Sequence, residues 1–379
     1  MRLLWLAENY PPDVGGMAWS CDRIVAGLRD ARFLIDVAHF ERRRNEWAVE
    51  PGEQGALLRG PITTEPGHTI NLLWHMVDGR HQQSAYTHVV AFGGFLPLLA
   101  APPFAKWLGA KLVTLLRGND FDTGIFSPRR SGILTEALRS SDAIGAVTSE
   151  QVRRLQCLLP NRHVVWTPNG IDFTSWKPLP SDLLRGAEWK QNNVEPGRRV
   201  LGLFGQLKEK KGVLFFLESL ARSPGVDRFH VLIVGTPEPA VIDFLRTASP
   251  PMAHTLVPFC DRYALLPYYA ATDIVIVPSF YDGMPNVLLE AVGLGIPILA
   301  SYVGGMVDVL NPESAMLFSP GDRHACSRAI DLAAHVTDAQ LAGMAVSALK
   351  TVSETFNSHR EIQRFVDLFR STQPAGGAS

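Results

Sequence analysis

The stretch DIVIVPSFYDGMPNVLLEAVGLGIPILAS, residues 273–301, decides the fold class of this chain. An apolar strand pattern at 273–279 is followed by a helix-length segment at 286–294 and by a second strand pattern at 296–301. A strand, a helix and a strand in this order form a unit whose two strands lie parallel in one sheet. Glu290 stands among apolar residues of the helical segment, and a buried carboxylate needs a polar partner.

The same alternation of short apolar runs and amphipathic segments continues through the whole chain. In the first half we expect strands at 3–7, 33–40, 70–76, 88–94, 110–116 and 143–148, and helices at 18–29, 96–108, 131–140 and 150–158. In the second half we expect strands at 199–205, 229–235, 254–259, 273–279, 296–301 and 315–320, and helices at 212–222, 238–247, 263–271, 286–294, 323–334 and 338–352. Both halves are therefore predicted to be doubly wound, Rossmann-like α/β domains.

The length of 379 residues exceeds the size at which a single hydrophobic core keeps growing, which favours two domains. Pro, Gly, Asn and Ser interrupt both periodicities at 168–199, and we place the domain boundary in that segment. The expected organisation is an N-terminal domain at 1–170, a C-terminal domain at 171–355, and a helix with a tail at 356–379. Apolar residues on one stripe of that helix indicate that it packs on the N-terminal domain.

Composition and charge exclude several classes of function. The formal net charge of −1 gives no basic field for nucleic acid. Four scattered cysteines, without a C-x-x-C pair or a His cluster, argue against a zinc site or a disulfide framework. The first residues lack an apolar run long enough for a signal peptide. We therefore expect a cytoplasmic protein that binds small molecules and carries no metal.

The longest apolar stretch, residues 89–116, is interrupted by three prolines and two lysines. We interpret it as a strand, a helix and a strand of a buried core and not as a membrane span. Peripheral contact of the 96–112 surface with a membrane remains a hypothesis.

Ligands of doubly wound sheets bind at the carboxyl ends of the strands, so the loops that follow strands are the candidate sites. In the loop 8–18, Gly15 and Gly16 allow close backbone approach at a helix N-terminus, which suits an anionic group; a tight turn is the alternative. No G-x-G-x-x-G follows the first strand, which disfavours a dehydrogenase. The loop 117–126 concentrates polar groups suited to hydroxyls or phosphates, and an Asx-rich turn is its alternative. Its polar residues are Arg117, Asn119, Asp120 and Asp122.

Two further loops lie in the second half. The loop 204–212 carries three lysines before Gly212, so an ammonium can reach a helix N-terminus; a solvated charge run is the alternative. Pro285 fits the first position of the next helix and Met284 is a poor N-cap, which leaves backbone donors for a ligand such as phosphate. Alternatively, Asp282 is the N-cap and Glu290 is a buried acid that pairs with a cation.

Taken together, these loops resemble the family 4 glycosyltransferases, which are retaining enzymes of the two-domain GT-B fold. The resemblance covers nearly the whole chain. It rests on ENYPPDVGG (8–16), RGNDFD (117–122), TPNGID (167–172), FGQLKEKKG (204–212) and SFYDGMPNVLLEAVGLGIPILAS (279–301). It implies two Rossmann-like domains that face an interdomain cleft, the N-terminal domain binding the acceptor and the C-terminal domain binding a nucleotide sugar.

The family's last motif has two glutamates separated by seven residues. By resemblance, Glu290 binds the ribose hydroxyls, Asp282 meets the donor sugar, and backbone N–H groups from Gly283 to Asn286 bind the diphosphate. The nucleotide-binding set implied in this way is Gly15, Gly16, Gln206, Gly283, Met284, Pro285, Asn286 and Glu290. The catalytic set is Lys211, Asp282, Arg117 and Asp120.

Two positions depart from the family pattern. Asp282 is one methylene shorter than the usual glutamate, and Gln206 replaces the usual diphosphate-binding arginine, whereas Lys211 matches the family's lysine. Loss of one cation implies that Lys211, with Arg117, carries more of the leaving-group stabilisation. Asp120 and Asp122 are assigned to hydroxyl binding or to loop structure rather than to a metal.

The function implied is transfer of a hexose from a nucleoside-diphosphate sugar to an acceptor hydroxyl, as in glycan biosynthesis. The donor is expected to be a UDP-sugar in preference to a GDP-sugar, with no cofactor and no metal. One alternative is a GT-B sugar-nucleotide epimerase, which needs no acceptor and is distinguished by its products. Another is a non-catalytic binder of nucleotide sugars, which the changes at Gln206 and Asp282 favour and the presence of Lys211 and Glu290 disfavours.

Overall fold

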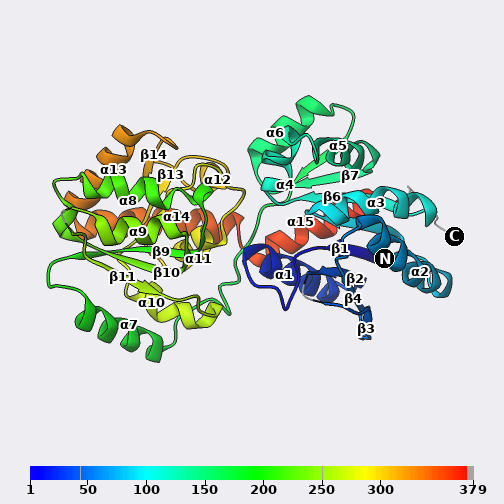
Figure 1. The fold of residues 1–379 in the computed structure, drawn as a ribbon, viewed down its shortest axis with the longest axis horizontal. Coiled ribbons are helices and arrows are strands. Elements are labelled where there is room, and N and C mark those ends of the chain that lie inside the picture. Colours follow the sequence, from blue (N-terminus) through cyan, green and yellow to red (C-terminus); the bar gives the residue numbers. More distant parts are fainter. Residues whose placement is uncertain (43, 250, 374–379) are drawn as a thin grey trace. The chain divides into compact units, whose positions relative to one another are not determined.

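The computed structural model describes residues 1–42, 44–249 and 251–373, which form two α/β units (Figure 1). Unit 1 comprises Met1–Asn169 together with the C-terminal segment from His359, and unit 2 comprises Gly170–Ser358. Each unit has its own sheet, covered by helices on both faces. The predicted fold class, two doubly wound α/β domains, is confirmed. The end of the predicted tail, from residue 374 onward, lies outside the described residues.

The sheet of unit 1 has the strand order β3-β4-β2-β1-β5-β6-β7-β8. All neighbouring strands are parallel except β3, which is antiparallel to β4. The strands are β1 Arg2–Ala7, β2 Leu34–Glu41, β3 Ala48–Glu50, β4 Leu57–Pro61, β5 His88–Phe92, β6 Lys111–Leu116, β7 Ala143–Ala146 and β8 His163–Trp166. The chain runs outward from β1 in one direction and returns to β5 on its other side. The carboxyl ends of β1 and β5 therefore form the switch point of this sheet, where ligands of such folds bind.

Unit 1 contains seven labelled α-helices within the described residues. They are α1 Gly16–Asp30, α2 Pro66–Gln83, α3 Phe95–Trp107, α4 Asn119–Asp122, α5 Ser131–Ser140, α6 Ser149–Leu158 and α15 Ser358–Ser371, with a 3₁₀ turn η1 at Gly124–Phe126. The apolar run of α3 is explained by burial, because Leu96, Ala100 and Phe104 belong to the core. Of the helices in the described ranges, none combines the length and the apolar character that crossing a bilayer requires.

Helix α15 packs on the core of unit 1 although it is distant in sequence (Figure 1). The ring of Phe369 lies 6.5 Å from that of Trp5 and 5.9 Å from that of Phe33, between ring centroids. Arg23 donates from Nε to Glu361 Oε2 at 2.8 Å and from Nη2 to Glu361 Oε1 at 2.9 Å. A buried bidentate pair with an apolar stripe fixes both the position and the rotation of the helix.

One predicted strand, 70–76, is wrong, because the segment lies inside helix α2. Thr69, Leu73 and Val77 are its buried residues, spaced by four, which is the period of a helix face and not of a strand. Pro66 lies at its first position, where a missing N–H costs nothing. The edge of the sheet is instead formed by β3 and β4, which the sequence reading missed.

The sheet of unit 2 has the order β11-β10-β9-β12-β13-β14, with all neighbours parallel. Its strands are β9 Arg199–Leu207, β10 Phe229–Pro237, β11 His254–Val257, β12 Ile274–Val277, β13 Ile298–Ser301 and β14 Met316–Phe318. Its helices are α7 Pro180–Asn193, α8 Val213–Ala221, α9 Pro239–Thr247, α10 Leu266–Ala270, α11 Asn286–Gly293, α12 Gly305–Val309, α13 Arg323–His335 and α14 Asp338–Thr355. The 3₁₀ turns are η2 Glu209–Lys211, η3 Val226–Arg228 and η4 Arg262–Leu265. The switch point of this sheet lies between β9 and β12.

The segment 168–199, expected as a linker, contains helix α7. The Asp182 carboxylate accepts the N–H of Leu179 at 2.8 Å and so caps the helix start. Only Asp182 and Gly186 are buried on this helix, so its apolar periodicity is too weak to be seen in the sequence. Gly186 is required by packing, because a Cβ there would lie 2.6 Å from the carbonyl oxygen of Pro267.

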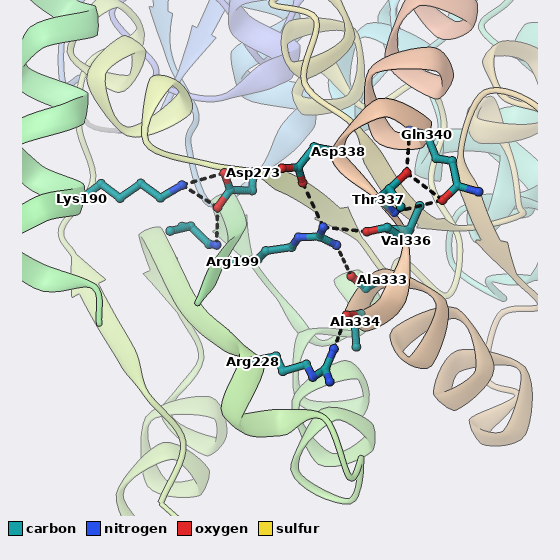
Figure 2. A network of polar contacts seen from close by, with 11 residues as sticks. Lys190, Arg199, Arg228, Asp273, Ala333, Ala334, Val336, Thr337, Asp338 and Gln340 are labelled. Atoms are coloured by element: carbon teal, nitrogen blue, oxygen red, sulfur yellow. Dashed lines mark hydrogen bonds and ion pairs between the residues drawn. The ribbon is translucent and has the colours of Figure 1, made fainter. Parts of the chain in front are cut away.

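A network of arginines at the amino edge of the unit 2 sheet closes the end of helix α13 (Figure 2). The Arg199 guanidinium donates to the carbonyl oxygens of Ala333 at 2.8 Å and Val336 at 2.6 Å. Arg228 donates to the carbonyl oxygen of Ala334 at 3.0 Å. The last carbonyls of a helix lack intrahelical donors, and cations there also oppose the negative end of the helix dipole.

A second part of this network joins α7 to the sheet (Figure 2). The Asp273 carboxylate accepts from Lys190 at 2.6 and 2.7 Å and from the Val200 N–H at 2.7 Å. One acid therefore fixes the starts of β9 and β12, the two strands that flank the switch point.

We expect Arg199→Ala to lower the free energy of unfolding of unit 2 by about 1–3 kcal/mol, because two carbonyls lose their donor. Urea denaturation measures the change. Arg246→Ala, which removes a guanidinium that is 75% exposed on α9, is the control and should change stability by less than about 0.5 kcal/mol. Equal effects of the two variants would contradict the structural role of Arg199.

Candidate functional site

Two loops of unit 2 meet at the carboxyl ends of β9 and β12. The N–H of Phe280 donates to the carbonyl oxygen of Lys210 at 2.9 Å. Gly212 has φ 63°, and a Cβ there would lie 2.1 Å from the carbonyl oxygen of Pro278. Only glycine satisfies both the left-handed conformation and this approach. The lysine-rich loop is therefore held against the loop that leads into α11.

The contact between these loops carries an ion pair. Lys211 Nζ bonds to Asp282 Oδ2, and Lys210 Nζ lies 3.9 Å from Asp282 Oδ1. The Asp282 side chain is 12% exposed and that of Lys211 is 27% exposed, so both are partly desolvated. The structure thus brings together two of the predicted catalytic residues. It does not support Asp282 as the N-cap of the next helix.

Helix α11 begins at Asn286, as the expected range 286–294 has it, with Pro285 as its cap residue instead of its first helical residue. Proline has no side-chain acceptor, so it caps none of the first backbone N–H groups. Met284 is buried, and the carbonyl of Gly283 accepts the N–H of Gly305 at 2.6 Å. The positive end of the helix dipole therefore lies beside the Asp282 loop.

A third loop supports this segment from the other side. Gly304 has φ 55° and ψ −132°, and a Cβ there would lie 1.8 Å from the carbonyl oxygen of Asp282. Ser301 Oγ donates to the carbonyl oxygen of Ser279 at 2.5 Å. The loop after β13 thus fixes the backbone of the 279–283 segment by direct contact.

Glu290 lies in the second turn of α11. Tyr269 donates its hydroxyl to Glu290 Oε2 at 3.1 Å, and Arg262 Nε lies 3.6 Å from Glu290 Oε1. The indole N–H of Trp176 donates to the carbonyl oxygen of Glu290 at 3.0 Å. Burial, reinforced by the Glu290 charge, raises the pKa of Tyr269 well above its ordinary value, so the phenol stays a donor. Glu290 has the cationic partner that a buried acid needs, and the sequence reading did not identify Arg262 as that partner.

Gln206 lies near the end of β9, in register with Thr236, and its side chain is exposed. Gly205 before it has φ 99°, and a Cβ there would lie 3.9 Å from Val287 Cγ2 in the first turn of α11. The end of β9 therefore lies close to the start of α11. At this place Gln206 offers a neutral amide where the family pattern has a charged arginine.

In unit 1, three loops meet at the carboxyl edge of the sheet. Gly15 has φ 126° and is the cap residue of α1. Glu8 Oε1 accepts the N–H of Phe95 at 2.9 Å and so caps α3. Gly93 has φ 49°, and a Cβ there would lie 2.9 Å from Asp120 Oδ2. Glu8 and Gly93 were missed as site residues, although Gly93-Gly94 directly after a strand is a signal of close backbone approach.

Arg117 points its guanidinium into unit 1. It donates to the carbonyl oxygen of Thr167 at 2.9 Å and to Asn169 Oδ1, and it lies 5.6 Å above the ring of Phe92. Burial lowers the pKa of Arg117 to about 10. The guanidinium is thus engaged with the end of unit 1.

The carboxylates of Asp120 and Asp122, in the 117–122 loop, both accept hydrogen bonds from groups within unit 1. Asp120 Oδ2 accepts the N–H of Arg117, three residues earlier in the chain, at 2.8 Å, and burial raises the pKa of Asp120. Asp122 Oδ2 accepts from Gln151 Nε2 at 3.1 Å, and burial raises the pKa of Asp122 to about 6. In the described residues, no group of three or more His, Cys, Asp or Glu side chains could hold a metal ion.

Residues 198–334 match the model of a family described as "Glycosyl transferases group 1". The match covers β9 to α13 and so contains Lys211, Asp282 and Glu290. The match covers less than half of the chain, and within it the resemblance inferred from the motifs is confirmed.

Two curated relatives and two solved structures are similar to this chain. D-inositol 3-phosphate glycosyltransferase of Rhodococcus erythropolis is 29% identical over 48% of this chain and 43% of its own length. Alpha-maltose-1-phosphate synthase of Mycolicibacterium smegmatis is 28% identical over 82% of each chain. Sucrose-phosphate synthase of Thermosynechococcus elongatus has a TM-score of 0.83 at 17% identity and 98% coverage of both chains. Anabaena HepE in complex with UDP-glucose has a TM-score of 0.75 at 18% identity, over 98% of this chain and 100% of its own.

The aligned part of this chain thus spans less than half the length of the Rhodococcus relative. The two structures, both below 20% identity, show that this chain shares their fold.

We expect Gly304→Ala to lower the free energy of unfolding of unit 2 by more than about 2 kcal/mol, because the new Cβ would overlap the Asp282 carbonyl and strain the backbone. Gly295→Ala is the matched control, since Gly295 has φ 71° but open space around a Cβ. It should show the smaller cost of strain alone in urea denaturation. Similar losses for both variants would contradict the close approach of the loops after β12 and β13.

Asp122→Asn tests the raised pKa of that carboxyl. Because the native pKa of about 6 lies above the ordinary value of 3.8, ionisation of Asp122 destabilises the native state. This penalty is absent below about pH 4, grows between the two values and is complete above pH 6. We expect the variant to equal the wild type at pH 4 and to exceed its stability by up to about 3 kcal/mol at pH 8.

Urea denaturation at the two pH values measures this difference. Asp30→Asn, at the exposed end of α1, serves as the control and should show no comparable dependence on pH. A constant difference between Asp122→Asn and the wild type across the window would refute the raised pKa.

Proposed function

We propose that this protein is a retaining, metal-independent glycosyltransferase that moves a hexose from a nucleoside-diphosphate sugar to an acceptor hydroxyl. The observation that carries the proposal is the convergence of Lys211, Asp282 and Glu290 at the switch point of unit 2, around the start of α11. The names of the relatives, a glycosyltransferase and a synthase, agree with this class of reaction.

In this proposal the donor nucleotide binds unit 2. Glu290 accepts the ribose hydroxyls, and the backbone of Gly283, Met284, Pro285 and Asn286 receives the diphosphate beside the positive end of the helix dipole. Lys211 exchanges Asp282 for a diphosphate oxygen. The released Asp282 carboxylate then accepts hydroxyls of the donor sugar. Gln206 contributes hydrogen bonds without charge.

Arg117 has a different assignment from that implied by resemblance. Its guanidinium is held by Thr167 and Asn169, so we assign it to fixing the end of unit 1 and not to the leaving group. Lys211 is then the principal cation at the diphosphate. In unit 1 we assign acceptor binding to the edge formed by Gly15, Gly16 and the loop of Asp120, a role that differs from the nucleotide binding that the resemblance implies for the two glycines. The positive φ of Gly15 permits close approach there.

The chemical step forms a bond between the acceptor oxygen and the anomeric carbon while the bond from that carbon to the diphosphate breaks on the same face. The acceptor proton passes to the departing diphosphate, so no protein base is required. Negative charge that develops on the leaving group is stabilised by Lys211 and by the N-terminus of α11. For the nucleotide we propose UDP, in line with the UDP-glucose named for HepE.

Calorimetric titration of the full chain with UDP, GDP and ADP, with and without EDTA, tests the proposal. We expect one of the three to bind selectively and EDTA to have no effect. Failure of all three to bind would overturn the proposed donor class. Loss of binding in EDTA would overturn metal independence, and donor conversion without any acceptor would favour an epimerase.

We expect Lys211→Ala to lower turnover of the donor about 100-fold, because the variant lacks the cation that stabilises the leaving diphosphate. The measurement is release of nucleoside diphosphate from the donor that titration identifies. Lys208→Ala, which removes an exposed lysine of the same loop, should leave turnover near that of the wild type. A large loss of thermal stability with little loss of turnover would assign Lys211 to structure instead.

A further inference from the structure

Glu290 is surrounded by three side chains that also contact one another. Arg262 from η4 stacks its guanidinium 4.7 Å from the centre of the Trp176 ring. Trp176 meets the ring of Tyr269 edge-on at 5.8 Å, and Tyr269 stacks on Phe204 of β9 at 4.0 Å. These partners therefore form a layered wall from the sheet outward, with Glu290 on one side of it.

The position of Arg262 in this wall is not explained by packing alone. Within the described part of the chain, its buried Nε has no hydrogen-bond partner. The ion pair that it forms is with Glu290, whose Oε1 lies 3.6 Å from that Nε, beyond normal hydrogen-bond length. Its side chain is 17% exposed, so the attraction between the two charges is only weakly screened by solvent. A largely buried guanidinium stacked on an indole keeps one orientation, which a flexible lysine would not.

We propose that Arg262 is a positioning residue that orients the Glu290 carboxylate for the ribose of the nucleotide. This inference rests on the proposed function, in which Glu290 binds the ribose hydroxyls. Arg262 holds Oε1 and Tyr269 holds Oε2, so the two oxygens are fixed in direction before the nucleotide arrives. The nucleotide then gains hydrogen bonds without the cost of ordering the acid.

The proposal makes the contribution of Arg262 depend on both Glu290 and the ribose. Arg262→Gln should weaken nucleoside diphosphate binding by about 5- to 30-fold, which lies within the range of coupling between neighbouring residues. Inorganic pyrophosphate has no ribose, so its affinity should not change. On a Glu290→Gln background, Arg262→Gln should cause no further loss.

The experiment is calorimetric titration of the full chain with two ligands. One is whichever of UDP, GDP and ADP the wild type binds most tightly, and the other is inorganic pyrophosphate. The proteins are the wild type, Arg262→Gln, Glu290→Gln and the double variant. Arg246→Gln removes an exposed guanidinium of unit 2 and is the charge control, expected to bind both ligands as the wild type does. Thermal melting of each protein establishes that the variants are folded.

Two conservative variants keep the test decisive if Arg262→Gln fails to fold. Tyr269→Phe removes only the hydroxyl that holds Oε2, and it should weaken nucleotide binding without affecting pyrophosphate. Arg262→Lys keeps the charge but loses the planar stack, and it should recover part of the affinity.

Several outcomes would overturn the proposal. Equal losses for nucleotide and pyrophosphate would place Arg262 at the diphosphate. An undiminished loss on the Glu290→Gln background would show that Arg262 does not act through the acid. Wild-type protein that binds none of the three nucleotides would overturn the proposed function together with this inference, and so is distinguishable from failure of the positioning role alone.

Discussion

The close approach of three backbone loops at the carboxyl edge of the unit 2 sheet is the constraint on which the site depends. Gly212 lies against Pro278, and Gly304 lies against Asp282, at distances that exclude any Cβ. Because these contacts involve backbone, they fix the loops after β9, β12 and β13 more rigidly than side-chain packing could. The strands themselves are anchored at the opposite edge, where Asp273 and Arg199 bind the strand starts and the end of α13 (Figure 2).

The charges of this site are paired within the protein. Lys211 is neutralised by Asp282, and Glu290 faces Arg262. Such pairs offset the desolvation that partial burial imposes, since an unpaired buried charge costs several kcal/mol. A ligand that reaches Lys211 must therefore replace Asp282 with a group of similar strength, which favours an anion.

Much of this arrangement could be predicted from the sequence, and the exceptions have physical reasons. Strands such as β12 and β13 are continuous apolar runs, which only a buried parallel strand explains. Residues 70–76 were misread because alternating apolar letters also fit a helix whose buried positions are Thr69, Leu73 and Val77. Helix α7 was missed because most of its residues face solvent.

The residues of the candidate site likewise include some that the sequence predicts and some that it does not. Lys211, Asp282 and Glu290 were recognisable because they lie in motifs of fixed spacing. Arg262 and Tyr269 belong to no such motif and reach Glu290 only through the fold of η4 and α10. The orientation of Arg117 was equally inaccessible, because the sequence does not show that Thr167 and Asn169 accept its guanidinium.

The departures from the family pattern at Gln206 and Asp282 both affect how Lys211 becomes available to a diphosphate. In the proposed function, with Gln206 neutral and Arg117 bound within unit 1, the diphosphate depends on Lys211, yet Lys211 is bound to Asp282. Diphosphate alone can take Lys211 only by leaving the partly buried Asp282 carboxylate with Lys210, which lies 3.9 Å away. A complete donor brings sugar hydroxyls that Asp282 can accept, and so removes this cost. In the function that we propose, the shorter acid would thus couple occupation of the sugar position to release of Lys211, and the site would discriminate a nucleotide sugar from the nucleotide that remains after transfer.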